Sequence, residues 1–256
     1  MSETRERLVA IVGLRLKVDE PLAAYTTMRV GGPADFLALA ETTAEAVALV
    51  GAARELGLPW RIIGRGSNLL VADAGVRGLV IRNTAARVQV RGDGTLVRAE
   101  AGLSCAQLAG RSARLGLAGA EFLVAIPGTV GGAVVQNAGA HGTETVELLS
   151  RVDYLAADGR VASFSADELG ARYRWSRFKE QPRDKAVLAA ELRLTHASPD
   201  AIAAKIAEIR TWRANSQPGE PSAGSIFTNP PGDYAGRLIE AAGLKGLRIG
   251  AAQISP

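Results

Sequence analysis

A serine directly follows a glycine in residues 221–230, PSAGSIFTNP, a loop rich in proline and small residues. Gly224 allows the backbone to come close to a ligand, and Ser225 could then donate a proton to a bound substrate. The loop lacks the G-x-S-x-G frame of an esterase, so nucleophilic catalysis by this serine is not indicated. On these residues alone, an ordinary turn serine is the simpler interpretation.

Aromatic and basic side chains alternate in residues 173–179, YRWSRFK. This pattern is compatible with the lining of an anionic pocket or with a solvated surface. The wider basic cluster comprises Arg172, Arg174, Arg177, Lys179, Arg183 and Lys185. Aromatic residues make up 5% of the chain and no nucleic-acid-binding module occurs, so a small phosphorylated ligand suits this charge better than a nucleic acid. A merely solvated basic face remains open.

Glycines interrupt the chain directly after the apolar run WRII, in residues 64–71, GRGSNLLV. The third glycine of the dinucleotide-binding fingerprint is missing, and an apolar run follows where that fingerprint requires a helix. We expect a short strand at residues 69–71. The exposed amide groups before it could cradle a pyrophosphate, or the glycines could form a structural turn.

A second glycine-rich stretch, residues 126–142, contains five glycines and no charged side chain. Flexible linkers are polar, whereas this stretch keeps Ile126, Val130, Val134 and Val135. Close approach of the backbone to a large flat ligand explains the composition better than a linker does.

The composition limits the class of protein. With 256 residues, 47% hydrophobic and 22% charged, the chain has material for one to three small globular domains. Its apolar runs are far shorter than a membrane span, and the N-terminus has no hydrophobic signal core. The lone Cys105 excludes an intramolecular disulfide, and with only two histidines we expect no metal centre.

The elements that must position these loops alternate between strands and helices. Residues 35–82 are βαβ-like, with a strand at 36–39, a helix opened by a capping box at Thr42 and Glu45, and a strand at 60–63. An amphipathic N-terminal helix is expected from Leu8, Ile11, Val12 and Leu14. Asp-Gly turns predict hairpins at 88–100 and 151–164.

Further helices are predicted at residues 103–115, 165–169 and 235–242, with a strand at 187–195. Pro199 and Asp200 open another helix, whose Ile202, Ile206 and Ile209 share one face and belong to the core. The boundary between a long α+β region and the helix with the serine loop is expected near residues 196–200.

Six stretches, taken together and in this order, resemble the UDP-N-acetylenolpyruvoylglucosamine reductase family. Each is weak alone, but six in register are highly specific. They are TTMRVGGPA at residues 26–34, GRGSNLL at 64–70, IPGTVGGA at 126–133, NAGA at 137–140, YRWS at 173–176 and SAGS at 222–225.

The resemblance implies an α+β fold of the vanillyl-alcohol-oxidase type. It places two FAD-binding subdomains at residues 1–84 and 85–198 and an α+β substrate domain at 199–256. The implied enzyme uses FAD and the co-substrate NADPH to reduce UDP-N-acetylglucosamine enolpyruvate to UDP-N-acetylmuramate in peptidoglycan synthesis. The same resemblance implies a cytoplasmic monomer with no nucleic-acid or membrane partner.

The resemblance also assigns residues. Arg174 matches the family's active-site arginine and Ser225 its proton donor, while Tyr173 and Asn229 match positions near the bound substrate. No metal ligand is implied. The residues matched to FAD binding are Gly64, Arg65, Gly66, Ser67, Asn68, Leu69, Ile126, Pro127, Gly128, Thr129, Gly131, Gly132, Asn137, Ala138 and Gly139.

Three features depart from the family pattern. Thr228 stands where the family usually carries lysine, and the interval from Tyr173 to Ser225 resembles a subtype without an extra tyrosine-bearing loop. The family continues beyond residue 256 with a segment that carries a catalytic glutamate, so a truncated substrate domain is expected. The alternatives are another FAD oxidoreductase of this fold or a catalytically inactive FAD-binding fragment.

Overall fold

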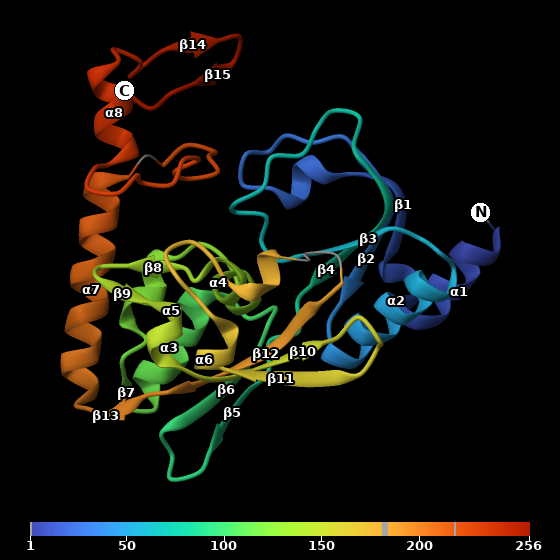
Figure 1. The fold of residues 1–256 in the computed structure, drawn as a ribbon, viewed down its shortest axis with the longest axis horizontal. Helices are drawn as coiled ribbons and strands as arrows, with labels where there is room; N and C mark the ends of the chain where they lie inside the picture. Colours follow the sequence, from blue (N-terminus) through green and yellow to red (C-terminus); the bar gives the residue numbers. More distant parts are fainter. Residues whose placement is uncertain (1, 181–183, 218) are drawn as a thin grey trace.

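The structure is a computed structural model that describes residues 2–180, 184–217 and 219–256. Arg183 of the basic cluster therefore lies outside the described residues. The chain forms two main sheets with helices packed on them, and a long helix leads to the C-terminal part (Figure 1).

The first sheet has the strand order β1-β2-β4-β3. Its strands are β1 (Leu16–Pro21), β2 (Pro33–Ala40), β3 (Trp60–Ile63) and β4 (Val76–Asn83). The central β4 is parallel to β2 and β3, whereas β1 is antiparallel to β2. Helices α1 (Ser2–Val12) and α2 (Thr43–Glu55) cover one face, where Leu8, Leu49 and Ile81 are buried together (Figure 1). The predicted βαβ-like unit is confirmed.

A capping box fixes the start of α2, as its sequence predicts. The backbone N–H of Glu45 donates to the Thr42 hydroxyl at 3.1 Å, and the Glu45 carboxylate accepts from the backbone N–H of Thr42. Arg15 forms a fork with the same carboxylate, at 2.6 and 2.9 Å. These hydrogen bonds, that of Arg15 foremost, lower the pKa of Glu45 to about 2.

Glu45→Gln is expected to reduce the free energy of unfolding at pH 7 by about 1 kcal/mol, because it removes a charge-assisted pair that is partly exposed. The folded-state pKa is depressed, so this contribution is present above the ordinary pKa of 4.5 and is lost as the pH falls toward about 2. Urea unfolding of variant and parent should therefore converge over that range. Glu41→Gln, at a carboxylate 3.3 Å from Arg15 but 64% exposed, is the control with a smaller effect.

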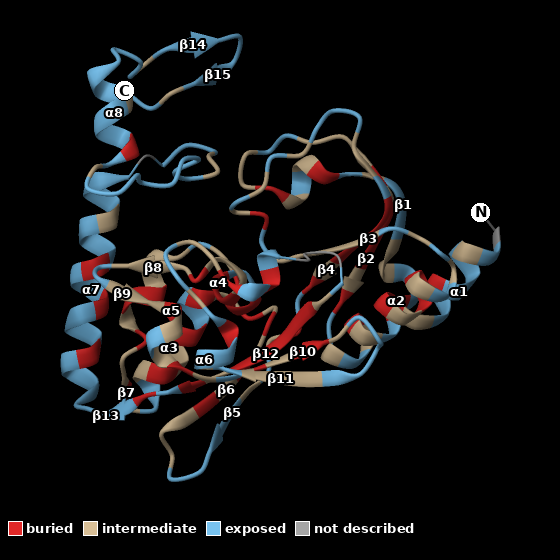
Figure 2. Ribbon diagram, viewed as in Figure 1, coloured by how far each residue is buried: buried red, intermediate tan, exposed pale blue. Residues whose placement is uncertain are grey.

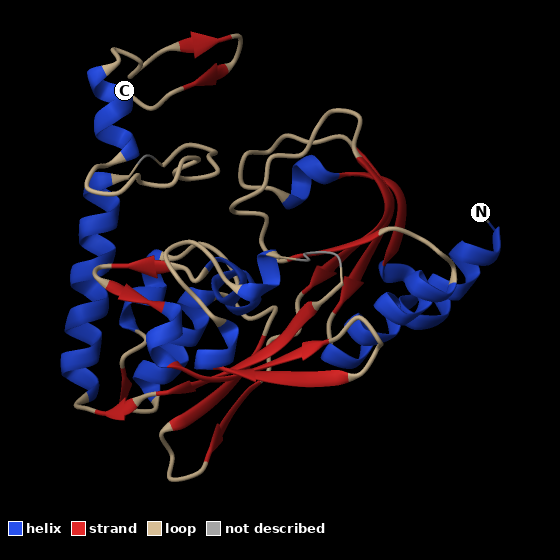
Figure 3. Cartoon of the chain, viewed as in Figure 1, coloured by secondary structure: helices blue, strands red, loops and turns tan. Residues whose placement is uncertain are grey.

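The second sheet is antiparallel throughout, with the order β11-β10-β12-β6-β5 (Figure 3). Its strands are β5 (Val88–Arg91), β6 (Leu96–Glu100), β10 (Leu149–Leu155), β11 (Val161–Ser165) and β12 (Ala186–Arg193). Both predicted hairpins, β5–β6 and β10–β11, are confirmed. The helices packed with this sheet are α3 (Cys105–Arg114) and α4 (Val130–Gln136), together with a 3₁₀ helix, Glu121–Ala125.

The two sheets share an apolar core. Leu155, Ala186 and Leu188 of the second sheet are buried in the same cluster as the residues of α2. Thr43 at the start of α2 also donates to the carboxylate of Glu100, the last residue of β6, at 2.9 Å. The loops that leave the two sheets are therefore held at fixed positions relative to each other.

The long helix α7 (Pro199–Ser216) buries Ile202, Ile206 and Ile209, as predicted. Beyond it, Figure 2 shows a largely exposed segment. That segment contains α8 (Ala235–Ala241), β14 (Arg248–Ile249) and β15 (Ala252–Gln253). The remaining short elements are β7 (Leu117–Ala118), β8 (Gly139–Ala140), β9 (Thr143–Glu144), α5 (Thr145–Leu148), α6 (Ala166–Leu169), β13 (Thr195–His196) and the 3₁₀ helices Gly13–Arg15, Leu22–Tyr25 and Arg177–Lys179.

Two local predictions are wrong. Residues 69–71 form no strand; they belong to the loop between β3 and β4, and Leu70 is 75% exposed. In that loop the Ala72 carbonyl accepts from the N–H of Gly32, so the backbone pairs with another loop and not with a sheet. Leu14 is fully exposed because α1 ends at Val12 and the left-handed Gly13 (φ 59°) breaks the helical period.

Candidate functional site

Residues 64–69 follow the carboxyl end of β3. Sheets of parallel strands commonly bind ligands at the carboxyl ends of their strands. The backbone of this loop contacts the backbone of residues 25–27 closely. A Cβ on Gly66 (φ 67°) would lie 2.0 Å from the carbonyl oxygen of Tyr25, and the Gly66 carbonyl accepts from the N–H of Thr27 at 3.2 Å. Glycine at this position is thus required by packing against residues 25–27.

Gly66→Ala is expected to reduce the free energy of unfolding by about 2–4 kcal/mol, because the new methyl group meets a backbone oxygen in a left-handed conformation. Gly57→Ala is the matched control, since Gly57 has a similar φ of 61° and no atom within 4 Å of its Cβ position. The free energy of unfolding of this control variant should fall by only about 1 kcal/mol. Urea unfolding curves that coincide for the two variants would refute the packing argument.

The backbone of the same loop offers hydrogen-bond donors. Within the described part of the chain, the N–H groups of residues 65–68 donate to no protein acceptor. Successive unpaired N–H groups at the end of a strand form the kind of concave site that binds phosphate oxygens. This loop therefore fits the pyrophosphate of a dinucleotide such as FAD.

The second glycine-rich stretch meets this loop. A Cβ on Gly64 would lie 2.4 Å from the hydroxyl oxygen of Thr129, so the Gly64 backbone packs directly against the Thr129 side chain. Thr129 also caps α4 by accepting from the N–H of Gly132 at 3.4 Å. The Gly128 carbonyl accepts from the N–H of Cys105 at 3.1 Å, which ties the stretch to α3. The structure thus brings the two predicted cofactor loops together.

Asn137 ends α4 in a left-handed conformation (φ 40°) and is 1% exposed. Its side-chain N–H₂ donates to the Glu144 carboxylate at 2.7 Å and to the Arg172 carbonyl at 3.2 Å. Its side-chain oxygen accepts from the N–H of Val146 at 3.0 Å. Both N–H donors of the amide are used within the protein, so the side chain positions the turn at Arg172, and a cofactor contact by Asn137 stays a prediction.

Tyr173 and Arg174 form the tip of a tight turn. Arg172 and Trp175 exchange backbone hydrogen bonds of 3.0 and 2.9 Å across it. Arg174 is left-handed (φ 55°), an unfavourable conformation for a non-glycine residue. Its guanidinium donates to the Gly139 carbonyl at 3.3 Å, the one hydrogen bond it makes among the described residues. Most of its five N–H donors therefore remain for a ligand.

Hydrogen bonds attach the serine loop to the rest of the protein on both sides of Ser225. The Thr27 hydroxyl donates to the Ser222 carbonyl at 2.6 Å, and the N–H of Asn229 donates to the Tyr173 hydroxyl at 3.4 Å. Ser225 lies between these contacts; it is exposed, and its hydroxyl donates to the Phe227 carbonyl at 3.1 Å. The structure thus joins the two predicted substrate residues, Tyr173 and Asn229, and places Ser225 on the loop that joins them.

Thr27 is a residue whose role the sequence did not reveal. Its N–H bonds the Gly66 carbonyl, and its hydroxyl bonds the Ser222 carbonyl. It therefore links the glycine loop of residues 64–69 to the serine loop of residues 221–230. The only signal was its place in the stretch TTMRVGGPA, one of the six that carried the resemblance.

Other chemistry is not indicated by the described residues. They contain no group of three or more His, Cys, Asp or Glu side chains that could hold a metal ion. None of the helices found among them is both long and apolar enough for a membrane span. Burial raises the pKa of the Cys105 thiol to about 12, so this cysteine is not a nucleophile.

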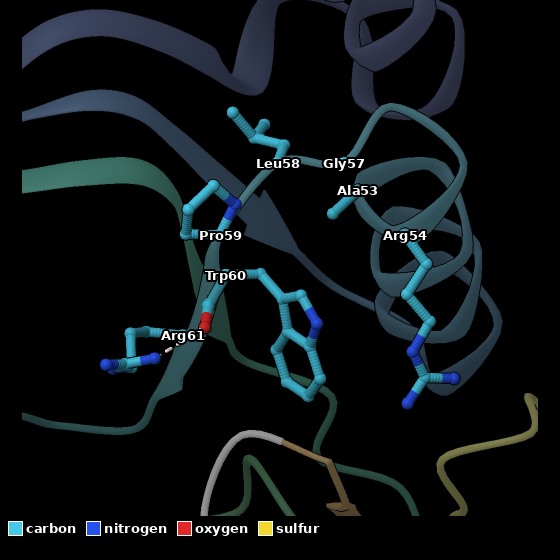
Figure 4. A pocket seen from close by; sticks show the side chains of 7 residues that line it. All are labelled: Ala53, Arg54, Gly57, Leu58, Pro59, Trp60 and Arg61. Atoms are coloured by element: carbon cyan, nitrogen blue, oxygen red, sulfur yellow. Dashed lines mark hydrogen bonds between the residues drawn. The ribbon is translucent and has the colours of Figure 1, made fainter.

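A separate hollow lies at the opposite, amino end of β3 (Figure 4). Arg54 of α2 faces the Trp60 ring there at 5.7 Å and donates to the Asp184 carbonyl at 3.0 Å. The Arg61 side chain extends away from the Trp60 ring and donates to the Trp60 carbonyl at 3.1 Å. None of the residues predicted to be functional lines this hollow. It is therefore distinct from the candidate site.

Comparison with known proteins gives a consistent result. A family model described as an FAD binding domain matches residues 34–165, and one described as the C-terminal domain of UDP-N-acetylenolpyruvoylglucosamine reductase matches residues 217–256. The UDP-N-acetylenolpyruvoylglucosamine reductase of Rubrobacter xylanophilus is 47% identical over 93% of this chain and 80% of its own length. Reductase 2 of Symbiobacterium thermophilum is 43% identical over 100% of this chain and 83% of its own length.

Solved structures are similar as well. The crystal structure of UDP-N-acetylenolpyruvylglucosamine reductase from Thermus caldophilus matches with a TM-score of 0.80 at 39% identity, over 94% of this chain and 85% of that one. p-Cresol methylhydroxylase matches with a TM-score of 0.57 at 15% identity, over 77% of this chain and 44% of that one. At that identity the second likeness concerns the fold alone.

Proposed function

The chain belongs to the UDP-N-acetylenolpyruvoylglucosamine reductase family, and from this premise we propose that NADPH is its hydride donor and that Arg174 and Ser225 carry the chemistry. The protein is an FAD-dependent enzyme that reduces enolpyruvyl UDP-N-acetylglucosamine in peptidoglycan synthesis. Its fold is the predicted α+β FAD-binding fold of the vanillyl-alcohol-oxidase type.

One observation carries the assignment of the site. The serine loop forms a hydrogen bond with Thr27, which contacts the glycine loop of residues 64–69, and another with Tyr173, which precedes Arg174. A hydroxyl donor and a fixed guanidinium are therefore held near the place where the cofactor loops meet.

The cofactor would be held mainly by backbone groups of the two glycine-rich stretches, residues 64–69 and 126–132. When bound, FAD would supply the hydride transfer from NADPH to the methylene carbon of the enolpyruvyl ether. Gly139, whose carbonyl accepts from Arg174, connects the second stretch to the active-site turn.

Arg174 stabilises the negative charge that develops on the enolpyruvyl carboxylate side of the substrate. A guanidinium stays protonated at any working pH and presents several donors in a fixed plane, so it suits an enolate-like charge. The left-handed turn and the bond to Gly139 fix the group before the substrate arrives, which removes the cost of reorganisation.

Ser225 donates its proton to the carbon next to the methylene and regains one from solvent. A serine hydroxyl is a weak acid, so it donates usefully only to a strongly basic carbanion, as this intermediate would be. Tyr173 and Asn229 hold the serine loop and the substrate in register.

The domain division proposed for this activity is 1–84 and 85–198 for FAD and 199–256 for the substrate. The first two ranges each contain one main sheet, and the third begins at Pro199, the first residue of the helix α7. A monomeric enzyme in the cytoplasm, without nucleic-acid or membrane partners, completes the proposal.

Steady-state assays of the purified chain reconstituted with FAD test this function. The protein should show the visible absorption of bound oxidised flavin. Without oxygen, it should consume more than one NADPH per flavin only when UDP-N-acetylglucosamine enolpyruvate is present. A flavin-loaded protein that oxidises NADPH with another acceptor but not with this substrate would point to a different oxidoreductase of the same fold. A protein without affinity for FAD would contradict the proposal altogether.

A further inference from the structure

Arg82 lies near the carboxyl end of β4, paired in register with Ile63, the last residue of β3 before the glycine loop. Side chains alternate along a strand, and Ile81 is buried under α1 and α2. Arg82 therefore projects from the other face of the sheet, as Val80 does. Figure 1 shows that α1 and α2 leave this face uncovered.

Among the described residues, the guanidinium of Arg82 has an aromatic neighbour but forms no ion pair with a carboxylate. Its central carbon lies 5.1 Å from the centroid of the Tyr25 ring. The nearby Glu20 carboxylate already accepts from the Tyr25 hydroxyl at 2.7 Å and from Lys17 at 2.8 Å. Within the described residues, Arg82 donates no hydrogen bond and pairs with no carboxylate. A half-buried, always charged group without a counter-ion is unfavourable by itself.

A second cation stands beside it. Burial lowers the pKa of Arg82; Tyr25 opposes that effect, and the positive charge of Arg65 adds to it. Arg65 begins the run of residues 65–68 whose backbone N–H groups donate to no protein acceptor in the described chain. Two guanidinium groups and a row of free amides thus gather at one end of β3.

We propose that Arg82, assisted by Arg65, binds the pyrophosphate of the FAD cofactor. The inference rests on the proposed function, since it assumes that FAD occupies the glycine loops. Two positive charges beside free amides match the two negative charges of a pyrophosphate, and Arg binds phosphate oxygens in a planar, bidentate manner. No motif marked this residue, because an arginine inside an otherwise apolar strand has no characteristic spacing.

Titration of the flavin-free protein with FAD and with riboflavin tests the proposal, because riboflavin lacks the phosphates. Arg82→Gln should weaken FAD binding by about 10- to 100-fold and leave riboflavin binding within about twofold, since one charge-assisted contact is lost. The dependence of FAD affinity on ionic strength should also become shallower. Arg82→Lys should keep part of the affinity, because the charge remains without the planar fork.

Arg77→Gln is the matched control, because Arg77 lies on the same strand but is bonded to Asp35, near the strand's other end. It lowers the net charge equally and should leave FAD affinity unchanged. Unchanged FAD affinity in Arg82→Gln would overturn the proposal, as would equal weakening of FAD and riboflavin binding. If Arg82→Gln weakened binding of UDP-N-acetylglucosamine more than binding of FAD, the proposal would be overturned too. Failure of the unsubstituted protein to bind FAD would instead refute the proposed function.

Discussion

Replacement of Ser225 by alanine is expected to slow reduction of the enolpyruvyl substrate by about 10²–10⁴-fold, the range typical of a lost proton donor. NADPH should still reduce the bound flavin at the parental rate, because that hydride transfer needs no proton from serine. The asymmetry follows from the position of Ser225, on the loop that contacts Tyr173 at Asn229. Among the described residues, Ser225 forms no hydrogen bond with the cofactor loops; its hydroxyl donates to the Phe227 carbonyl in its own loop.

Rapid mixing under anaerobic conditions separates the two half-reactions. Ser222→Ala is the matched control, since the Ser222 hydroxyl lies in the same loop and, within the described residues, accepts a single turn bond from the N–H of Gly224. That variant keeps the backbone carbonyl that binds Thr27 and should retain most of the activity. If Ser225→Ala slowed both half-reactions equally, Ser225 would be a structural residue and its assignment as proton donor would be wrong.

Replacement of Arg174 by asparagine is expected to reduce kcat for the enolpyruvyl substrate by about 10²–10³-fold, because a preorganised positive charge is lost where negative charge develops. Asparagine tolerates the left-handed backbone that Arg174 adopts, so the fold should be kept. Arg174→Lys should recover little activity, since an ammonium group does not reproduce the planar set of donors.

Arg172→Gln is the control for Arg174. Arg172 is exposed, and its guanidinium lies over the Trp175 ring at 3.6 Å, so its loss removes a neighbouring charge of the same cluster. Steady-state kinetics of both variants, with thermal unfolding in parallel, check the prediction. An Arg174→Asn protein that is as stable and as active as Arg172→Gln would contradict the role given to Arg174.

Local signals predicted much of the fold. The capping box predicted at Thr42 and Glu45 forms, and the helix predicted at residues 165–169 begins with a second one, of Ser165 and Glu168. In both, the partners are three residues apart and need no tertiary context. The Asp-Gly turns likewise form hairpins, since the turn itself sets the pairing of the two strands.

The helix α4 escaped prediction for a tertiary reason. Gly131 and Gly132 disfavour a helix, yet α4 begins there because Thr129 caps it and Val130 and Val134 are buried against the second sheet. The strand expected at residues 69–71 failed for the opposite reason. Its apolar residues suggested burial, but the chain forms a loop there and leaves Leu70 exposed.

The candidate site could be predicted as a set of loops but not as a geometry. The contact between Asn229 and Tyr173 joins residues 56 positions apart, and no local pattern encodes that distance. Asn137 appeared in a matched stretch, but only the structure shows that its side chain is occupied by Glu144 and the Arg172 carbonyl. Arg82 gave no signal in the sequence at all.

Anaerobic reoxidation of the reduced holoprotein is the most direct test of the function. The protein-bound FAD is first reduced with NADPH, excess nucleotide is removed, and UDP-N-acetylglucosamine enolpyruvate is added without oxygen. We expect that the absorption of oxidised flavin returns and that UDP-N-acetylmuramate appears in an amount equal to the flavin. Flavin that stays reduced in the presence of this substrate, in a protein that binds FAD and is reduced by NADPH, would contradict it.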